Sequence, residues 1–181
     1  MKLLKYFLIV VCLYSLPLLA NEKSKKEALA PELKIFQDYL GTWEAEFKPA
    51  ADGSPVIDVS HWERALNGKA LRTLHSINDG VYGGESLIFF DKKLNKLVFY
   101  YFTTADFMTK GEMEVLSDNS FVAYEDVSGQ SEMSKGISKV KSVSTLENNK
   151  MTVSTSYLKN GKWTEPETRT YYPSNKTVKF K

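Results

Sequence analysis

The chain contains two histidines, and both lie on one expected β-hairpin. His61 and His75 flank Asn67-Gly68, a dipeptide that strongly favours a two-residue hairpin turn. Such a turn pairs His61 with Leu74 and His75 with Ser60. Because side chains alternate between the two faces of a strand, the histidines then lie on opposite faces. This spacing argues against a metal site built from both imidazoles, and we expect no bound metal or other cofactor.

The same hairpin places Glu63 directly opposite Arg72. On the surface, such an ion pair stabilises a fold by only ~0.2–1 kcal/mol. Inside a cavity, the guanidinium would anchor the polar head group of a ligand. Both faces of the hairpin are half apolar, and we predict that the Glu63–Arg72 face lines the cavity, because its smaller residues leave space. A plain surface ion pair is the alternative. The residues expected to contact a ligand are Glu63, Arg72, His61, Leu74, Phe89 and Tyr100.

Several catalytic motifs are incomplete. The glycine-rich stretch 80–85 lacks the Lys-Ser/Thr of a phosphate-binding loop. Ser86 lacks the second glycine of a nucleophile elbow. Glu165 and Glu167 share a strand face, but Pro166 between them indicates a strand edge or bulge rather than a pair of glycosidase carboxylates. No catalytic residue is predicted, and a binding protein is favoured over an enzyme.

Strands must position these residues, because hydrophobic residues recur with a period of two from Thr42 onward. Turn residues separate the segments, as in DGSP at 52–55 and ENN at 147–149, at intervals of about 8–12 residues. Short links imply antiparallel neighbours, and closure removes the two open edges. The sequence therefore predicts an all-β, antiparallel up-and-down barrel of about ten strands. The expected strands are 42–49, 56–66, 69–78, 84–91, 96–104, 110–117, 120–127, 137–146, 150–158 and 162–172.

A short helix is expected before the first strand, over residues 31–40. Pro31 suits its first turn, and Gly41 ends it. Its apolar residues recur at helical spacing and form one face. The residues of that face are Leu29, Leu33, Phe36 and Leu40.

The hairpin over 84–104 is the most apolar part of the predicted barrel, and both of its faces carry large apolar side chains. One face would line the interior. The other would be covered by the N-terminal helix or by a second copy of the chain, or would remain an ordinary aromatic exterior. A homodimer through this hairpin is therefore possible.

A short helix followed by Gly41-Thr42-Trp43 and antiparallel strands resembles the lipocalin and fatty-acid-binding (calycin) pattern. The resemblance implies that a tryptophan plugs one end of the barrel and that an arginine of the last strand lies across it. The matching residues are Trp43 and Arg169, and a guanidinium stacked on an indole gains ~0.5–2 kcal/mol. A solvated cation is the alternative for Arg169. The stretches YLGTWEAEF and ERALNGKALR also resemble secreted bacterial domains of unknown function with this fold.

A fainter resemblance connects the chain with nitrobindin-type haem barrels. In those barrels a histidine near the C-terminus binds iron. No histidine follows His75 in this chain, so the resemblance does not extend to that haem ligand.

Charge content argues against a nucleic-acid-binding protein. The chain has 24 Lys and Arg residues against 22 Asp and Glu. Removal of Lys2 and Lys5 with an N-terminal signal leaves 22 against 22. A neutral body lacks the basic face that nucleic-acid binding requires.

Residues 1–20 have the pattern of a cleaved secretory signal peptide. Lys2 and Lys5 precede an apolar core that ends at Pro17, and Ala20 is a small residue at the cleavage point. A membrane anchor is the alternative, but the apolar run of ~15 residues is shorter than the ~20 that a spanning helix needs.

Cys12 is the only cysteine, so one chain forms neither a disulfide nor a thiolate zinc site. A lipoprotein that uses Cys12 is disfavoured, because the preceding Val11 is bulky. We expect residues 21–30 to be a flexible leader and residues 31–181 to form a single domain. The expected location is the periplasm or the extracellular space.

Together these features predict an exported barrel that binds a small apolar or amphipathic molecule in its cavity, a function drawn from analogy with the fold. One alternative is an enzyme acting in the same cavity, with Arg72, Glu63 and a tyrosine as acid–base or oxyanion groups. A convergent polar cluster in a closed pocket would distinguish it. The other alternative is a filled barrel that serves as an interaction protein.

Overall fold

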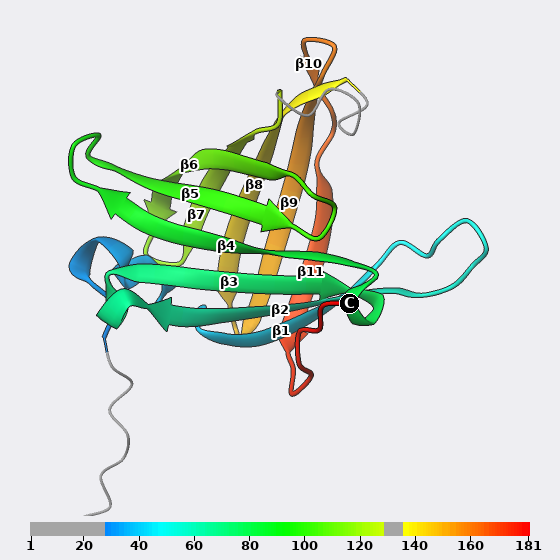
Figure 1. The fold of residues 1–181 in the computed structure, drawn as a ribbon, viewed down its shortest axis with the longest axis horizontal. Coiled ribbons are helices and arrows are strands. Elements are labelled where there is room, and N and C mark those ends of the chain that lie inside the picture. The colour runs from blue at the N-terminus through cyan, green and yellow to red at the C-terminus, as the bar shows by residue number, and fades with distance from the viewer. Residues whose placement is uncertain (1–27, 129–135) are drawn as a thin grey trace, which may run out of the picture.

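The computed structural model describes residues 28–128 and 136–181. Ten long strands form a closed antiparallel barrel, in which β11 completes the ring against β1, and the two-residue β10 adds to β9 (Figure 1). The predicted all-β barrel with a short N-terminal helix is confirmed. The helical elements are η1 (Pro31–Phe36), η2 (Leu66–Gly68) and η3 (Asn78–Gly80). The strands are β1 (Gly41–Phe47), β2 (Val56–Ala65), β3 (Ala70–Ile77), β4 (Tyr82–Asp91), β5 (Lys96–Thr103), β6 (Met108–Ser117), β7 (Ser120–Asp126), β8 (Ile137–Glu147), β9 (Lys150–Lys159), β10 (Lys162–Trp163) and β11 (Glu167–Pro173).

Asparagine and aspartate residues shape most of the chain reversals. Nearly all non-glycine residues with positive φ are Asn or Asp at turns, where these side chains tolerate the left-handed conformation. Asn67 has φ 55° between β2 and β3. The register predicted from this turn is confirmed, since Glu63 pairs with Arg72 and His61 with Leu74.

One expected strand, 162–172, is interrupted. β10 ends at Trp163 and β11 begins at Glu167, with Pro166 between them. Proline has no N–H to continue a ladder of hydrogen bonds. Both pieces nevertheless pair with β9.

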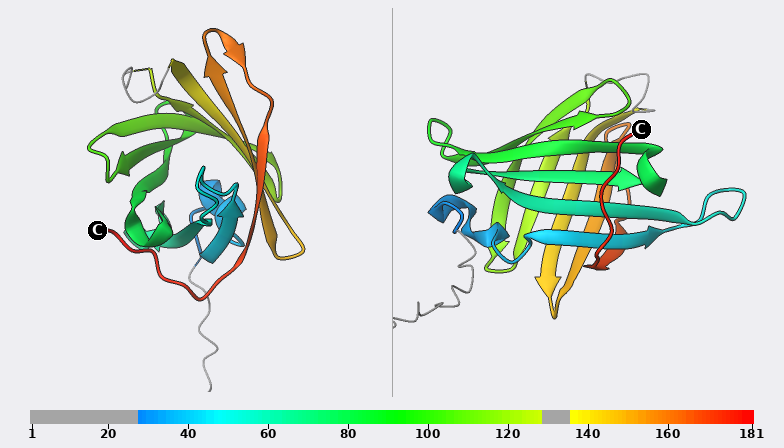
Figure 2. Two further views of the ribbon diagram at one scale, coloured as in Figure 1. Left: turned by 90° about the vertical axis from the view of Figure 1, so that its right-hand side faces the viewer. Right: turned by 60° about the horizontal axis from the view of Figure 1, so that its bottom comes forward.

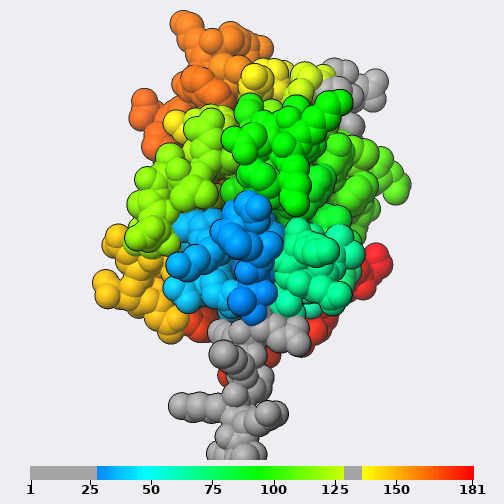
Figure 3. Space-filling view, turned by 90° about the vertical axis from the view of Figure 1, so that its left-hand side faces the viewer, coloured from blue at the N-terminus to red at the C-terminus, as the bar shows by residue number. Residues whose placement is uncertain are grey.

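The helix η1 closes one end of the barrel, which it covers in the space-filling view (Figure 3). It is a 3₁₀ helix over 31–36 rather than the helix expected over 31–40, and this tight form suits a short connection. Leu33 and Phe36 are buried as predicted, and Tyr39 is also fully buried. Four aromatic rings form the floor of the barrel, with centroids 5.1–6.4 Å apart. This aromatic floor consists of Phe36, Tyr39, Trp62 and Phe121.

Trp43 joins the helix to the barrel. It is 4% exposed, and its Nε1 donates a hydrogen bond to the Tyr39 carbonyl at 2.7 Å. Its predicted burial is confirmed, but the predicted stacking of Arg169 on Trp43 is wrong. Trp43 pairs with Pro173, so Arg169 lies four residues, or ~13 Å, further along the barrel. The Arg169 guanidinium instead lies 4.4 Å from the centre of the Phe47 ring.

The hairpin of β4 and β5 presents one face to the interior and the other to the outside. Ile88 and Phe99 are buried on the inner face, while Tyr100 and Phe102 are 40% and 49% exposed on the outer face. The expected covering of the outer face by the N-terminal helix is wrong, because η1 plugs the end of the barrel. A second copy of the chain on this face stays a prediction.

The predicted signal peptide, 1–20, lies outside the described residues, as does most of the predicted leader, 21–30. Leu29 of that leader is buried, and the Ala30 N–H donates to the Gly68 carbonyl at 2.8 Å. The packed part of the chain therefore begins before residue 31. Within the described residues, no helix combines the length and the apolar character needed to cross a membrane.

The C-terminal strap, residues 174–181, crosses the outside of the barrel (Figure 2). Lys176 Nζ pairs with Glu44 of β1 at 2.6 Å. The Lys179 N–H donates to Ser76 Oγ of β3 at 3.1 Å. The strap thus ties β1 to β3 and forms one wall of an outer groove described below.

Candidate functional site

The interior of the barrel holds a cavity of about 330 Å³ that is open to solvent. Near η1 its wall is apolar and continues the aromatic floor. Toward the other end it becomes polar. The apolar lining includes Trp62, Ile88, Phe99, Met113, Phe121 and Met151. The polar lining includes His75, Tyr101, Glu125 and Tyr171, with Ser60, Thr73, Ser86, Ser142 and Ser144 along the walls.

The face of β2 and β3 that lines this cavity is opposite to the predicted one. Arg72 lies outside, where it pairs with Glu63 at 3.1 Å and with Glu85 at 2.6 Å. All three side chains are about two-fifths exposed, which preserves the hydration that a group of charges would lose inside the barrel. Trp62 and Leu71 face inward instead, because a closed barrel must be filled to normal packing density.

A hydrogen-bonded chain crosses the polar end of the cavity and joins five strands, β2, β3, β4, β5 and β11. His75 Nδ1 lies 2.9 Å from Asp58 Oδ1, and His75 Nε2 lies 2.7 Å from the Tyr101 hydroxyl. The Tyr101 hydroxyl lies 3.1 Å from that of Tyr82. Tyr171 donates to the other carboxylate oxygen of Asp58 at 2.9 Å. We call these five residues the Asp58–His75 network.

The donors of this network follow from its acceptors. An ionised Asp58 only accepts, so His75 Nδ1–H donates to it. In a neutral imidazole, Nε2 then accepts the Tyr101 proton, and Tyr82 must donate to Tyr101. Asp58 is 2% exposed, so both of its carboxylate oxygens depend on these partners.

Burial keeps the tyrosines of the interior protonated. It raises the pKa of each one above the ordinary value, and the neighbouring Asp58 charge adds to this effect in Tyr171. Their hydroxyls therefore remain hydrogen-bond donors at neutral pH. We call them the interior tyrosines: Tyr39, Tyr82, Tyr101 and Tyr171.

Glu125 lies on β7 beside the network, where it lines the cavity and also borders the outer pocket described below. Thr109 Oγ1 donates to its Oε1, and this is the one hydrogen bond that Glu125 accepts within the described part of the chain. Burial raises the pKa of Glu125, while the Thr109 hydrogen bond and the charge of His75 lower it in part. Because Thr109 is its one donor among the described residues, the Glu125 carboxylate can accept further hydrogen bonds from the cavity.

Two glycines allow aromatic rings to lie flat against the cavity wall. A Cβ at Gly84 would come within 2.5 Å of the Tyr101 ring, and a Cβ at Gly111 within 2.5 Å of the Phe99 ring. Neither glycine has a positive φ, so close approach is what requires them: a Cβ would also meet a carbonyl oxygen of the neighbouring strand, that of Phe102 at Gly84 and that of Tyr124 at Gly111, and these oxygens lie nearer than the rings. These contacts fix two rings that border the polar end.

Four of the predicted ligand residues lie together in a groove outside the barrel. His61, Glu63, Arg72 and Leu74 border this groove of about 560 Å³, and the C-terminal strap forms its other wall. His61 Nδ1 lies 2.8 Å from Thr42 Oγ1. His61 and His75 lie on opposite faces, as predicted, because only His75 faces the cavity.

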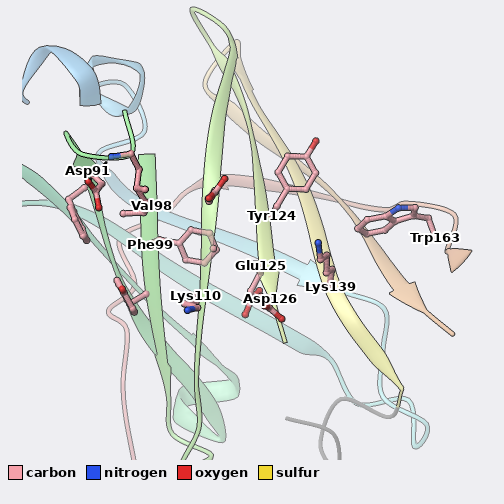
Figure 4. Close-up of a pocket in the computed structure, with 14 residues that line it drawn as sticks. Asp91, Val98, Phe99, Lys110, Tyr124, Glu125, Asp126, Lys139 and Trp163 are labelled. Atoms are coloured by element: carbon pink, nitrogen blue, oxygen red, sulfur yellow. Dashed lines mark hydrogen bonds between the residues drawn. The ribbon is translucent and has the colours of Figure 1, made fainter. Parts of the chain in front are cut away.

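Phe89 and Tyr100, the other two predicted ligand residues, also lie outside. They border a second outer pocket of about 660 Å³ that extends over β5–β8 toward Trp163 of β10 (Figure 4). Lys110, Tyr124, Asp126 and Lys139 project from its wall. The six residues predicted to share one site are thus divided between two outer sites.

Asp58, Glu125 and Tyr171 were not among the site residues predicted from the sequence. Their positions along the strands could have identified them as inward-facing. Asp58 shares a face with Trp62, and Glu125 shares a face with Phe121, so each polar residue continues a row of inward-facing bulky residues. Among the described residues, no three His, Cys, Asp or Glu side chains are grouped as metal ligands.

The fold is similar to that of a solved structure, the crystal structure of Rv2717c from M. tuberculosis. The TM-score is 0.53 at 11% sequence identity, and the match covers 81% of this chain and 99% of the other. At this identity the likeness concerns the fold alone. No family model and no curated protein matches the sequence.

Proposed function

We propose that this protein binds a small amphipathic molecule inside the barrel. The observation that carries the proposal is the chemical division of the cavity, with an aromatic floor at one end and the Asp58–His75 network at the other. Cavities that bind small molecules commonly combine apolar walls with a few placed polar groups. The calycin resemblance in the sequence and the predicted export signal favour a role of this kind in the cell envelope or outside the cell.

The size of the cavity limits the ligand. One water molecule occupies about 30 Å³ in the liquid, so 330 Å³ corresponds to ~11 water molecules. The proposed ligand therefore has on the order of ten non-hydrogen atoms. The His75 side chain is 27% exposed, so solvent reaches the polar end.

The test is isothermal titration calorimetry with hexan-1-ol, which has an apolar chain and one hydroxyl. We expect saturable binding to the wild type and its loss in Ser86→Leu, which fills the cavity. Ser154→Leu, at an outward-facing position of β9, is the matched control and should bind as the wild type does. Circular dichroism checks folding, and Ser142→Leu replaces Ser86→Leu if that variant does not fold. Equal binding in the filled and control variants, or no binding to the wild type, would refute the proposal.

A second candidate function is acid–base catalysis on the bound molecule. The observation in its favour is that Asp58 orients His75, which in turn contacts the Tyr101 hydroxyl. This is a convergent polar cluster, although it does not contain the Arg72 and Glu63 expected from the sequence. The test is to incubate a small-molecule extract of the protein's own host with the wild type or with Tyr101→Phe. Mass spectrometry should show a compound consumed only by the wild type; identical extracts would exclude this function for the compounds present.

A further inference from the structure

We propose that the cavity selects an amphipathic molecule with a positively charged nitrogen, an organic ammonium, whose head group is held by Glu125. This inference rests on the proposed function and names the class of ligand. It is argued from the charges that line the cavity, from the rings around them and from the partners of each carboxylate.

When Glu125 is ionised, the polar end of the cavity carries an excess of negative charge. Glu125 is its one carboxylate in direct contact with the cavity, and no Lys or Arg is among the described residues that line it. If His75 is protonated, it compensates Asp58, and Glu125 still leaves one negative charge. If His75 is neutral, both carboxylates remain uncompensated. In either case a cation is the complementary occupant.

Arg169, on the same face of β11 as Tyr171, already has partners. Arg169 stacks on Phe47 at 4.4 Å and pairs with Glu167 at 3.0 Å. It therefore has partners other than Glu125.

The two carboxylates differ in their capacity for a ligand. Asp58 accepts from His75 at one oxygen and from Tyr171 at the other, so each of its oxygens already has a donor, and Asp58 is not among the residues that line the cavity. Glu125 accepts one hydrogen bond, from Thr109, and faces the cavity. An ammonium N–H aimed at Glu125 would form a charge-assisted hydrogen bond, which is roughly twice as strong as one between neutral groups. The positive charge of the ammonium would also lower the pKa of Glu125, which opposes the effect of burial on this carboxyl.

Aromatic rings near Glu125 favour an organic cation over a metal ion. Phe99 and Tyr101 line the same cavity, and the faces of such rings attract a cation. Rings offer no lone pair to a metal, whereas an alkylammonium contacts them with both its charge and its methylene groups. Trp62 and the rest of the aromatic floor then accommodate the apolar chain.

The test compares three molecules that share a hexyl chain: hexylammonium, hexan-1-ol and hexanoate. At neutral pH the amine is protonated and the acid is ionised. We expect hexylammonium to bind the wild type about tenfold or more tightly than hexan-1-ol, as a hydrogen bond to a charged group provides. Hexanoate should bind most weakly. In Glu125→Gln the preference for hexylammonium over hexan-1-ol should fall to about threefold or less.

Asp126→Asn is the matched control, since Asp126 is the next residue and borders the outer pocket. It should keep the full ammonium preference. Equal binding of all three compounds to the wild type, or a preference for hexanoate, would overturn this inference and leave the proposed function standing. A preference that survives in Glu125→Gln, or that disappears in Asp126→Asn, would place the cation elsewhere and also overturn it. If none of the three binds, the proposed function fails as well.

Discussion

The hydrogen bond from Tyr171 to Asp58 should be among the strongest single polar contributions to stability. Tyr171 lies on β11 and Asp58 on β2, and their 2.9 Å contact lies beside the strand that closes the barrel. Both residues are buried, at 9% and 2% exposure. Hydrogen bonds to charged groups contribute ~1.5–3 kcal/mol, and the remaining Asp58 oxygen would be left without a donor. Tyr171→Phe should therefore lower the free energy of unfolding by ~1.5–3 kcal/mol, out of a total of ~5–15 kcal/mol.

The neighbouring residue provides the control. Tyr172 is 51% exposed, and its ring contacts Lys150 Nζ at 5.6 Å on the outside of the barrel. Tyr172→Phe should change the free energy of unfolding by less than ~0.5 kcal/mol. Urea denaturation followed by circular dichroism measures both variants, and equal m-values would show that the unfolded states are comparable. If Tyr171→Phe and Tyr172→Phe agree within ~0.5 kcal/mol, Tyr171 does not support Asp58 as described.

The remaining predictions concern packing, closure and pH. Gly111→Ala should lower the free energy of unfolding by ~1–3 kcal/mol, because its Cβ meets the Tyr124 carbonyl oxygen and the Phe99 ring; Lys110→Ala, on the outer face, should have little effect in the same urea experiment. A double-mutant cycle between Arg169→Ala and Phe47→Ala should give a coupling energy of ~0.5–2 kcal/mol, whereas a larger coupling of Arg169 to Trp43 would restore the register expected from the sequence. Since folding raises the pKa of the interior tyrosines, the stability they support is complete below pH ~10 and is lost as the pH rises further. Each interior tyrosine should lower the free energy of unfolding by up to ~1.4 kcal/mol per pH unit in this range. An unchanged midpoint of urea denaturation between pH ~9 and ~11 would contradict this.

Local patterns in the sequence were sufficient for the barrel and for one register. The Asn67-Gly68 turn fixes the pairing of β2 with β3, because the short connection over residues 66–69 leaves little freedom in alignment. The pairing of β1 with β11 joins the two ends of the domain, and no turn connects them. The position of Arg169 relative to Trp43 was therefore beyond what local patterns specify.

Which face of β2 and β3 points into the barrel was harder to predict from the sequence. Both faces of β2 and β3 are half apolar, and the smaller residues on one face suggested an open interior. The structure shows that large side chains fill the floor, while space remains where His75 and Glu125 line the wall. A buried polar network is identified only when its partners are known, and Asp58, His75 and Tyr101 come from three different strands.

The most direct test of ligand binding in the barrel is an intermolecular nuclear Overhauser experiment with hexylammonium and isotope-labelled protein. We predict contacts from the hexyl methyl group to Trp62 and Ile88, and from the methylene beside nitrogen to Tyr101, which lines the cavity and not the outer pocket. Contacts confined to Tyr100 and Tyr124 of the outer pocket would contradict this prediction.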